Sequence, residues 1–181
     1  MASPLTVVCG NACTGKTTWA KSLSLCTDAT LLDIDTVSER LVMAAQIELG
    51  RDPKDRDSSD YKRVYRDAIH ETLFALTGDN PGSTIIVAPF TRERRMSDFN
   101  LWLTEKLGRS VQIHYFVSAD EIRKQRLIAR GNPRDLLKLQ DFSVYATLGQ
   151  EETRPGYPHQ WFDTSESFPD VSTYLARARN G

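Results

Sequence analysis

Residues 5–19, LTVVCGNACTGKTTW, join an apolar, β-branched run to a glycine loop and then to helix-forming sequence. Gly10, Gly15, Lys16 and Thr17 complete the Walker A pattern G-x-x-x-x-G-K-[ST]. The glycines let the backbone turn tightly, and successive N–H groups with the N-terminus of the next helix form a cradle for phosphates. Lys16 adds a positive charge over the β- and γ-phosphates, and the Thr17 hydroxyl suits Mg²⁺. The stretch therefore predicts a strand, a phosphate loop and a helix that hold a nucleoside triphosphate.

The phosphate cradle is expected to use every residue of this loop and the start of the helix. Its expected members are Gly10, Asn11, Ala12, Cys13, Thr14, Gly15, Lys16, Thr17 and Thr18. We interpret Cys13 as a small residue that the loop tolerates, and a redox-sensitive thiol is the alternative.

Length and composition indicate one ordinary globular domain spanning residues 1–181. The chain has 23 basic and 24 acidic residues. The resulting near-zero net charge argues against a general nucleic-acid coating protein. Cys9, Cys13 and Cys26 have no metal-ligand spacing, and their odd number predicts reduced thiols and a cytoplasmic location. No stretch approaches the roughly 18 apolar residues of a membrane span, so we expect no membrane association.

Five apolar strand signals alternate with helical patterns. They cover residues 5–9, 29–34, 84–88, 111–117 and 160–164. This alternation predicts an α/β fold with a parallel sheet and right-handed crossovers. Asp33 and Asp35 stand at the carboxyl end of the second strand, where ligands bind in such sheets. Both carboxylates are therefore expected on the same edge as the phosphate loop. His114, in the middle of the fourth strand, is interpreted as a packed residue.

Residues 37–78 form an insertion between the second and third strands, longer than a simple crossover needs. Two helices are predicted in it. The first carries an apolar stripe at spacings of three and four, made of Val37, Leu41, Ala44 or Ala45, and Leu49. We interpret the insertion as the wall of a second pocket that faces the phosphate loop. Plain crossover packing is the alternative.

A helix is predicted over residues 92–107, with Arg92, Arg94 and Arg95 in its first turn. The helix dipole disfavours cations there, and a nearby ligand anion would resolve the conflict. A solvated basic turn is the alternative interpretation.

A capping box at Ser118 and Glu121 predicts a further helix that runs to about Arg130. It carries Arg123, Arg126 and Arg130 on one face, and a second helix is predicted over residues 135–147. This region, 118–147, is interpreted as a helical hairpin able to fold over a triphosphate, because the arginine fork grips phosphate oxygens at two points. A solvated basic face is the alternative.

Four segments carry a resemblance that covers nearly the whole chain. They are GNACTGKTT at 10–18, LDID at 32–35, IIVAPFTRERR at 85–95 and RKQRLIARGNPRD at 123–135. Together they resemble the P-loop kinases of the nucleoside-monophosphate kinase and shikimate kinase type. The resemblance is closest to the AAA_33-like group, which includes zeta toxins, chloramphenicol phosphotransferase and the kinase domain of phage polynucleotide kinase. It implies a three-layer α/β P-loop fold with strand order 2-3-1-4-5, an acceptor-binding insertion (37–78) and an arginine-bearing lid (118–147).

The resemblance also implies roles, with ATP and Mg²⁺ as expected cofactors. Asp35 looks like the carboxylate that orients and deprotonates the acceptor hydroxyl, although Asp33 remains an alternative base. Asp33 looks like the residue that, with Thr17, steadies Mg²⁺. Charge on the transferring phosphoryl group is expected to be neutralised by Lys16, Arg126 and Arg130. Arg126 is also expected to bind the nucleotide. Acceptor contacts are expected from Asp35, Arg40, Arg92, Arg95 and Arg134.

Two departures from the polynucleotide-kinase pattern bear on the acceptor. An alanine, Ala88, follows the third strand where an acidic residue is common, and Ser38 stands where an arginine is expected. Metal binding would then depend on Thr17 and Asp33, and a nucleic-acid 5′-end becomes a less favoured acceptor.

Three functions remain open at this point. The first is a kinase for a hydroxyl of a small metabolite, sugar, antibiotic or nucleotide-sugar. The second is a polynucleotide or nucleoside 5′-hydroxyl kinase, and the third is a switch ATPase, disfavoured because the third strand lacks an acidic residue. The oligomeric state is left open.

Overall fold

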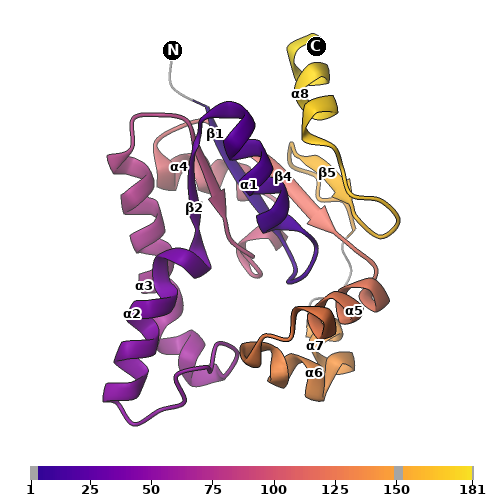
Figure 1. Ribbon diagram of the computed structural model, residues 1–181. Helices are drawn as coiled ribbons and strands as arrows, with labels where there is room; N and C mark the ends of the chain where they lie inside the picture. The colour runs from indigo at the N-terminus through magenta and orange to yellow at the C-terminus, as the bar shows by residue number, and fades with distance from the viewer. Residues whose placement is uncertain (1–3, 149–152, 181) are drawn as a thin grey trace.

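The computed structural model describes residues 4–148 and 153–180, and a five-stranded parallel sheet lies at their centre (Figure 1). Its strands are β1 (Leu5–Gly10), β2 (Thr30–Asp33), β3 (Thr84–Val87), β4 (Gln112–Val117) and β5 (Gln160–Asp163). They lie in the order β2-β3-β1-β4-β5. In the central strand, Val8 pairs with Val87 on one side and with His114 on the other. The predicted fold class and strand order are confirmed.

Helices cover both faces of the sheet, which gives three layers (Figure 1). On one face lie α1 (Lys16–Thr27) and α8 (Val171–Asn180), and on the other lie α3 (Ser59–Asp79) and α4 (Phe99–Leu107). Successive strand residues point to opposite faces, so Val7 packs with α3 and α4 while Val8 packs with α1 and α8. No helix in the described part of the chain is both long and apolar enough to cross a membrane.

The remaining helices gather toward the carboxyl ends of the strands (Figure 1). The helix α2 (Ile34–Glu48) forms a hairpin with α3. The helices α5 (Asp120–Arg130), α6 (Leu136–Gln140) and α7 (Phe142–Leu148) make up the region that the sequence predicts to be a lid. Two short 3₁₀ helices, η1 (Glu93–Arg95) and η2 (Pro133–Asp135), precede α4 and α6. Lys138 Nζ of α6 lies 2.6 Å from Asp57 Oδ2 in the loop between α2 and α3. The lid and the insertion therefore meet below the sheet edge.

Two predicted helix starts are wrong. The helix α2 begins at Ile34, because the Asp33 carboxylate accepts a hydrogen bond from the Asp35 N–H at 2.9 Å and caps the helix. Asp35 therefore lies in the first helical turn and not at a strand end. The helix α4 begins only at Phe99, and the three arginines before it lie around a separate 3₁₀ turn.

The predicted capping box and the predicted apolar stripe are also wrong. Ser118 does not cap α5; its hydroxyl lies 3.4 Å from Arg126 Nη1 instead. In α2 the buried residues are Val42 and Gln46, while Leu41 is 73% exposed. This helix packs on α3 and on its own following loop, where Gln46 donates to the Asp55 carbonyl. The predicted apolar stripe is therefore partly solvated, at Leu41 and Leu49, while Val37 packs against the core.

His114 is a buried link between the sheet and two helices. Its Nδ1 accepts a hydrogen bond from Trp19 Nε1 at 3.0 Å, and its Nε2 lies 2.8 Å from the Tyr174 hydroxyl. Because Nδ1 is the acceptor, Nε2 carries the proton and donates it to Tyr174. The imidazole thus ties β4 to α1 and α8 in its neutral form, as a packed residue.

This buried imidazole predicts how stability depends on pH. Burial lowers the pKa of His114 from 6.5 to about 3, so the unfolded chain binds the proton first as the pH falls. As far as His114 is concerned, the folded state has its full stability above about pH 6.5 and loses stability progressively as the pH falls toward about 3. We expect the free energy of unfolding, measured by urea denaturation, to fall by roughly 3–5 kcal/mol over this window. His114→Gln should flatten the dependence, and a variant with the wild-type slope would contradict the assignment.

Candidate active site

The phosphate loop leaves the carboxyl end of β1 through positions that only glycine fits. At Gly10, φ is +133° and a Cβ would lie 2.0 Å from the Phe116 carbonyl oxygen of β4. At Gly15, the N-cap of α1, φ is +90° and a Cβ would lie 2.5 Å from the Phe168 ring. Left-handed backbone of this kind favours glycine. The two glycines therefore bring the loop backbone close to β4 and direct it into α1.

Lys16 is buried inside the loop, where its ammonium donates a hydrogen bond to the Asn11 carbonyl oxygen. The Thr14 hydroxyl donates to the same oxygen at 2.9 Å. Burial, and after it the nearby Arg94 guanidinium, lower the pKa of Lys16 to about 8, while Asp35 acts in the opposite direction. A phosphate anion above Lys16 would offset both the burial and the repulsion.

Two carboxylates meet the loop at the junction of β2 and α2. The Thr17 hydroxyl donates to Asp33 Oδ2 at 2.9 Å, and Asp33 is 7% exposed. Asp33 uses its other oxygen to cap α2, which presents Asp35 one residue into the helix. Asp35 is exposed and close enough to Lys16 to raise the pKa of the ammonium. The structure therefore brings Lys16, Thr17, Asp33 and Asp35 together, as the sequence predicted.

The pair of Thr17 and Asp33 fits a magnesium ion by its chemistry. Hydroxyl and carboxylate oxygens are ligands that Mg²⁺ accepts, and in nucleotide sites it takes one or two carboxylates plus substrate phosphates and water. Among the described residues no group of three His, Cys, Asp or Glu side chains forms a metal cluster on its own. The donor set therefore suits a metal that arrives with the nucleotide, and the assignment of Mg²⁺ stays a prediction.

The lid arginines are held in two different ways. Arg126 Nη1 donates to the Cys13 carbonyl at 3.2 Å and to the Thr164 hydroxyl at 2.9 Å, so it joins α5 to the phosphate loop and to the end of β5. Arg130 Nε donates to Asp135 Oδ2 at 2.8 Å, and that carboxylate is 1% exposed. Arg126 thus contacts the phosphate loop directly. Arg130 would have to weaken or break its ion pair with Asp135 before it could contact a phosphate.

The amino-terminal half of α3 lies near the candidate base. Burial raises the pKa of Tyr61, and Asp35 raises it further while Arg56 lowers it, which places Tyr61 near Asp35. Arg66 of α3 forms a largely buried ion pair of 2.7 Å with Glu93 in the turn after β3. These contacts bring the insertion next to the candidate base, and its role in acceptor binding stays a prediction.

The arginines predicted for the acceptor do not gather at one point. Arg40, Arg92 and Arg95 are exposed. Arg40 forms no hydrogen bond or ion pair with the described residues. The side chain of Arg134 lies outside the part of the chain that the structure describes. Acceptor contacts by these four residues stay predictions.

Three residues of the site were missed. Arg94 Nη2 donates to Asn11 Oδ1 at 2.6 Å, Arg123 Nε donates to the Ala12 carbonyl at 3.2 Å, and the Thr164 hydroxyl donates to the Thr14 carbonyl at 3.0 Å. Arg123 shares a helix face with Arg126 and Arg130, which is a usable signal. Nothing in the local sequence separates Arg94 from its two arginine neighbours.

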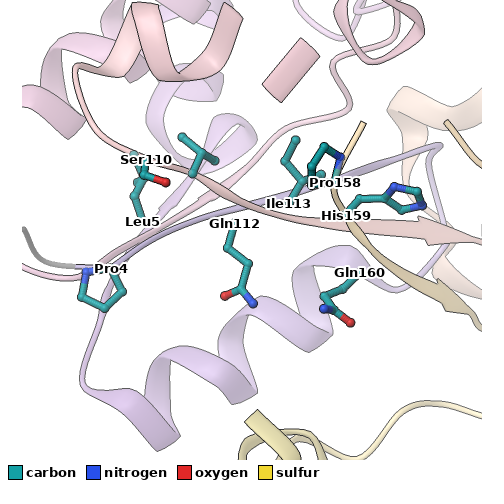
Figure 2. Close-up of a pocket in the computed structure, with 9 residues that line it drawn as sticks. Pro4, Leu5, Ser110, Gln112, Ile113, Pro158, His159 and Gln160 are labelled. Carbon is teal, nitrogen blue, oxygen red and sulfur yellow. The ribbon is translucent and has the colours of Figure 1, made fainter. Parts of the chain in front are cut away.

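A cavity of about 590 Å³ lies at the opposite edge of the sheet (Figure 2). Its lining includes Leu5, Gln112, His159 and Gln160, at the amino ends of β1, β4 and β5. Ligands of open α/β sheets bind beyond the carboxyl ends of the strands. The candidate site is therefore the loop edge, and this cavity is separate from it.

Comparisons with known proteins agree with this geometry. The family model AAA_33, described as an AAA domain, matches residues 5–144. A comparison with curated proteins found no match. Among solved structures, the chain is similar to a candidate kinase from Chloroflexus aurantiacus J-10-fl, with 17% identity, a TM-score of 0.68, and coverage of 99% of this chain and 98% of that one.

Two further structures show the same fold. The first is a sugar kinase from Janibacter sp. HTCC2649, with 19% identity, a TM-score of 0.60, and coverage of 98% of this chain and 93% of that one. The second is a shikimate kinase from Acinetobacter baumannii in complex with shikimate, with 16% identity, a TM-score of 0.52, and coverage of 98% and 91%. At these identities the likeness establishes the architecture, and the chemistry must be argued from the site.

Proposed function

Because this chain belongs to the AAA_33 family of AAA domains, we propose that it is a kinase that transfers the γ-phosphate of ATP to a hydroxyl of a small-molecule acceptor. The observation that carries the proposal is the carboxylate pair at the start of α2. Asp33 binds the Thr17 hydroxyl of the phosphate loop, and Asp35 lies within electrostatic range of Lys16. One carboxylate thus serves the nucleotide side and the other faces the acceptor side.

The reaction needs positioning, neutralisation of charge and a base. The acceptor oxygen attacks the γ-phosphorus, the bond to the β,γ-bridging oxygen breaks, and ADP leaves. Asp35 takes the proton of the acceptor hydroxyl, while Lys16, Arg126 and Arg130 neutralise charge on the transferring group. Thr17 and Asp33 would hold Mg²⁺, which supplies charge stabilisation on the β- and γ-phosphate oxygens.

The insertion, residues 37–78, is the proposed acceptor wall. Support comes from Tyr61, which lies near Asp35, and from the buried pair of Arg66 and Glu93, which fixes α3 beside the turn after β3. The exposed Arg40, Arg92 and Arg95 remain proposed contacts for polar groups of the acceptor. The thiols of Cys9, Cys13 and Cys26 form no disulfide. Together with the proposed use of ATP, this favours the cytoplasm as the compartment.

A transfer screen with [γ-³²P]ATP and Mg²⁺ tests the proposal. The panel contains sugars, hydroxy acids, antibiotics, nucleosides and oligonucleotides with a free 5′-hydroxyl, and the Lys16→Met variant gives the background. We expect label on a small-molecule hydroxyl, at a rate at least about 10²-fold above that background. Labelling of oligonucleotide 5′-ends alone would favour a polynucleotide kinase, and release of inorganic phosphate without any labelled acceptor would favour a switch ATPase.

A further inference from the structure

One of the three neighbouring arginines after β3 points inward. Arg94 is 3% exposed, whereas Arg92 and Arg95 are exposed. Its Nη2 donates to the Asn11 side-chain oxygen at 2.6 Å, and its guanidinium lies over the Tyr115 ring with 5.5 Å to the centroid. A buried guanidinium therefore touches the second residue of the phosphate loop, from a segment that is 83 positions away in the chain.

The turn that carries Arg94 is braced on several sides. Phe90, buried in the core, adopts φ +45°, a conformation that costs energy for any residue but glycine. Its carbonyl accepts the Arg94 N–H at 2.9 Å, and the Tyr157 hydroxyl donates to the Arg94 carbonyl at 2.8 Å. The pair of Glu93 with Arg66 fixes the adjacent residue. The backbone under Arg94 is thus strained and held from separate elements, as is common where a side chain must be placed accurately.

Asn11 links Arg94 to the Lys16 ammonium. The Asn11 side chain accepts from Arg94, and its backbone carbonyl accepts from Lys16 and from the Thr14 hydroxyl. Movement of Arg94 would therefore move the oxygen that Lys16 and Thr14 bind. Two buried cations this close repel each other and lose hydration. That arrangement suits a site whose ligand is a polyanion.

We propose that Arg94 is a positioning residue for phosphoryl transfer, which holds Asn11, and through it the Lys16 ammonium, at the phosphate end of the loop. The inference rests on the proposed function for the transfer step. The effect of Arg94 on Lys16 concerns nucleotide binding, so it can be measured without any acceptor.

The test compares Arg94→Gln, Arg94→Lys and the exposed control Arg177→Gln from α8. With the acceptor found by the screen, Arg94→Gln is expected to lower kcat by about 10²-fold, because a misplaced reacting group costs this much. Arg94→Lys restores the charge and not the two-point fork, so it should recover part of the rate. Arg177→Gln should match the wild type.

The second readout is the affinity for Mg·ATP at neutral pH, measured without any acceptor. Arg94→Gln should weaken Mg·ATP binding, because the Asn11 residue that binds the Lys16 ammonium is no longer held in place. Arg94→Lys should recover part of this affinity. A structural brace alone would give equal losses in both variants.

Wild-type kcat and wild-type Mg·ATP affinity in Arg94→Gln would overturn the inference. Equal loss of both quantities in Arg94→Gln and Arg94→Lys would make Arg94 a structural brace and also overturn it. If Arg94→Gln does not fold, Asn11→Ala removes the same contact, and it should lower both kcat and Mg·ATP affinity. Absence of transfer in the wild type, with weaker Mg·ATP binding in Arg94→Gln, would reject the proposed function and keep the link from Arg94 to Lys16.

Discussion

Replacement of Lys16 by methionine is expected to abolish phosphoryl transfer, with a loss of at least about 10³-fold in kcat. Lys16 is the buried cation of the phosphate loop, and its ammonium is oriented by the Asn11 carbonyl. In the transition state, charge spreads over the oxygens of the transferring group, so a fixed cation there stabilises it more than the ground state. The measurement is the labelled-phosphate assay, with Lys21→Ala, an exposed lysine of the same helix, as the matched control.

The same variant should be more stable than the wild type when no nucleotide is present. The pKa of Lys16 is lowered to about 8 in the fold from 10.5, so below about pH 8 the buried ammonium destabilises the folded chain. Methionine removes that cost, which corresponds to an upper estimate of about 3 kcal/mol. The gain should shrink between about pH 8 and 10.5, where the wild-type lysine loses its proton on folding.

A thermal melt with and without Mg·ATP separates the two effects. Wild type should gain stability as nucleotide binds the folded state, and Lys16→Met should show a higher melting temperature alone but little gain with nucleotide. Transfer at the wild-type rate by Lys16→Met would reject every triphosphate-dependent function considered for this chain.

The sequence predicted those parts of the site that depend on one continuous stretch or on sheet topology. The pattern from Gly10 to Thr17 contains both the turn and its ligand chemistry, so the loop and α1 could be located directly. Asp33 and Asp35 could be placed on the same edge because the carboxyl ends of parallel strands meet there. The match of the AAA_33 model to residues 5–144 confirms the resemblance on which the strand order rested.

The remaining features depend on contacts that local sequence does not encode. Arg94 points inward, unlike its two arginine neighbours, because the backbone turns at Phe90 and the Asn11 side chain accepts its hydrogen bond. Phe90 and Asn11 lie far apart in the sequence. The capping box failed because α5 begins at Asp120 with Ala119 as its N-cap, one residue after Ser118. The Ala119 N–H donates instead to the Ser165 hydroxyl, a contact from a distant part of the chain. Periodicity also misplaced part of the apolar stripe of α2, since Val37 at the start of the helix packs against the core while Leu41 and Leu49 are exposed.

Asp35→Asn is expected to lower kcat by about 10² to 10⁴-fold, the range for loss of a general base. The amide keeps the size of the side chain and cannot accept the hydroxyl proton. Asp33 would still cap α2 through the Asp35 backbone N–H, so folding and Mg·ATP affinity should change little. Asp170→Asn is the matched control, because Asp170 is an exposed acidic residue at the amino end of α8 and has a similar relation to a helix dipole.

Asp33→Asn separates the two carboxylates. Asp33 binds the Thr17 hydroxyl and caps α2. The asparagine amide oxygen can still cap the helix, so the main effect should be a higher Mg²⁺ concentration needed for half-maximal rate. Asp35→Asn should leave the Mg²⁺ requirement unchanged and lower the rate at saturating metal. If the rate loss at saturating Mg²⁺ followed Asp33 instead, Asp33 would be the base. If Asp35→Asn transferred phosphate as fast as Asp170→Asn, the carboxylate next to Lys16 would have no part in the chemistry, and the site would be reduced to nucleotide binding.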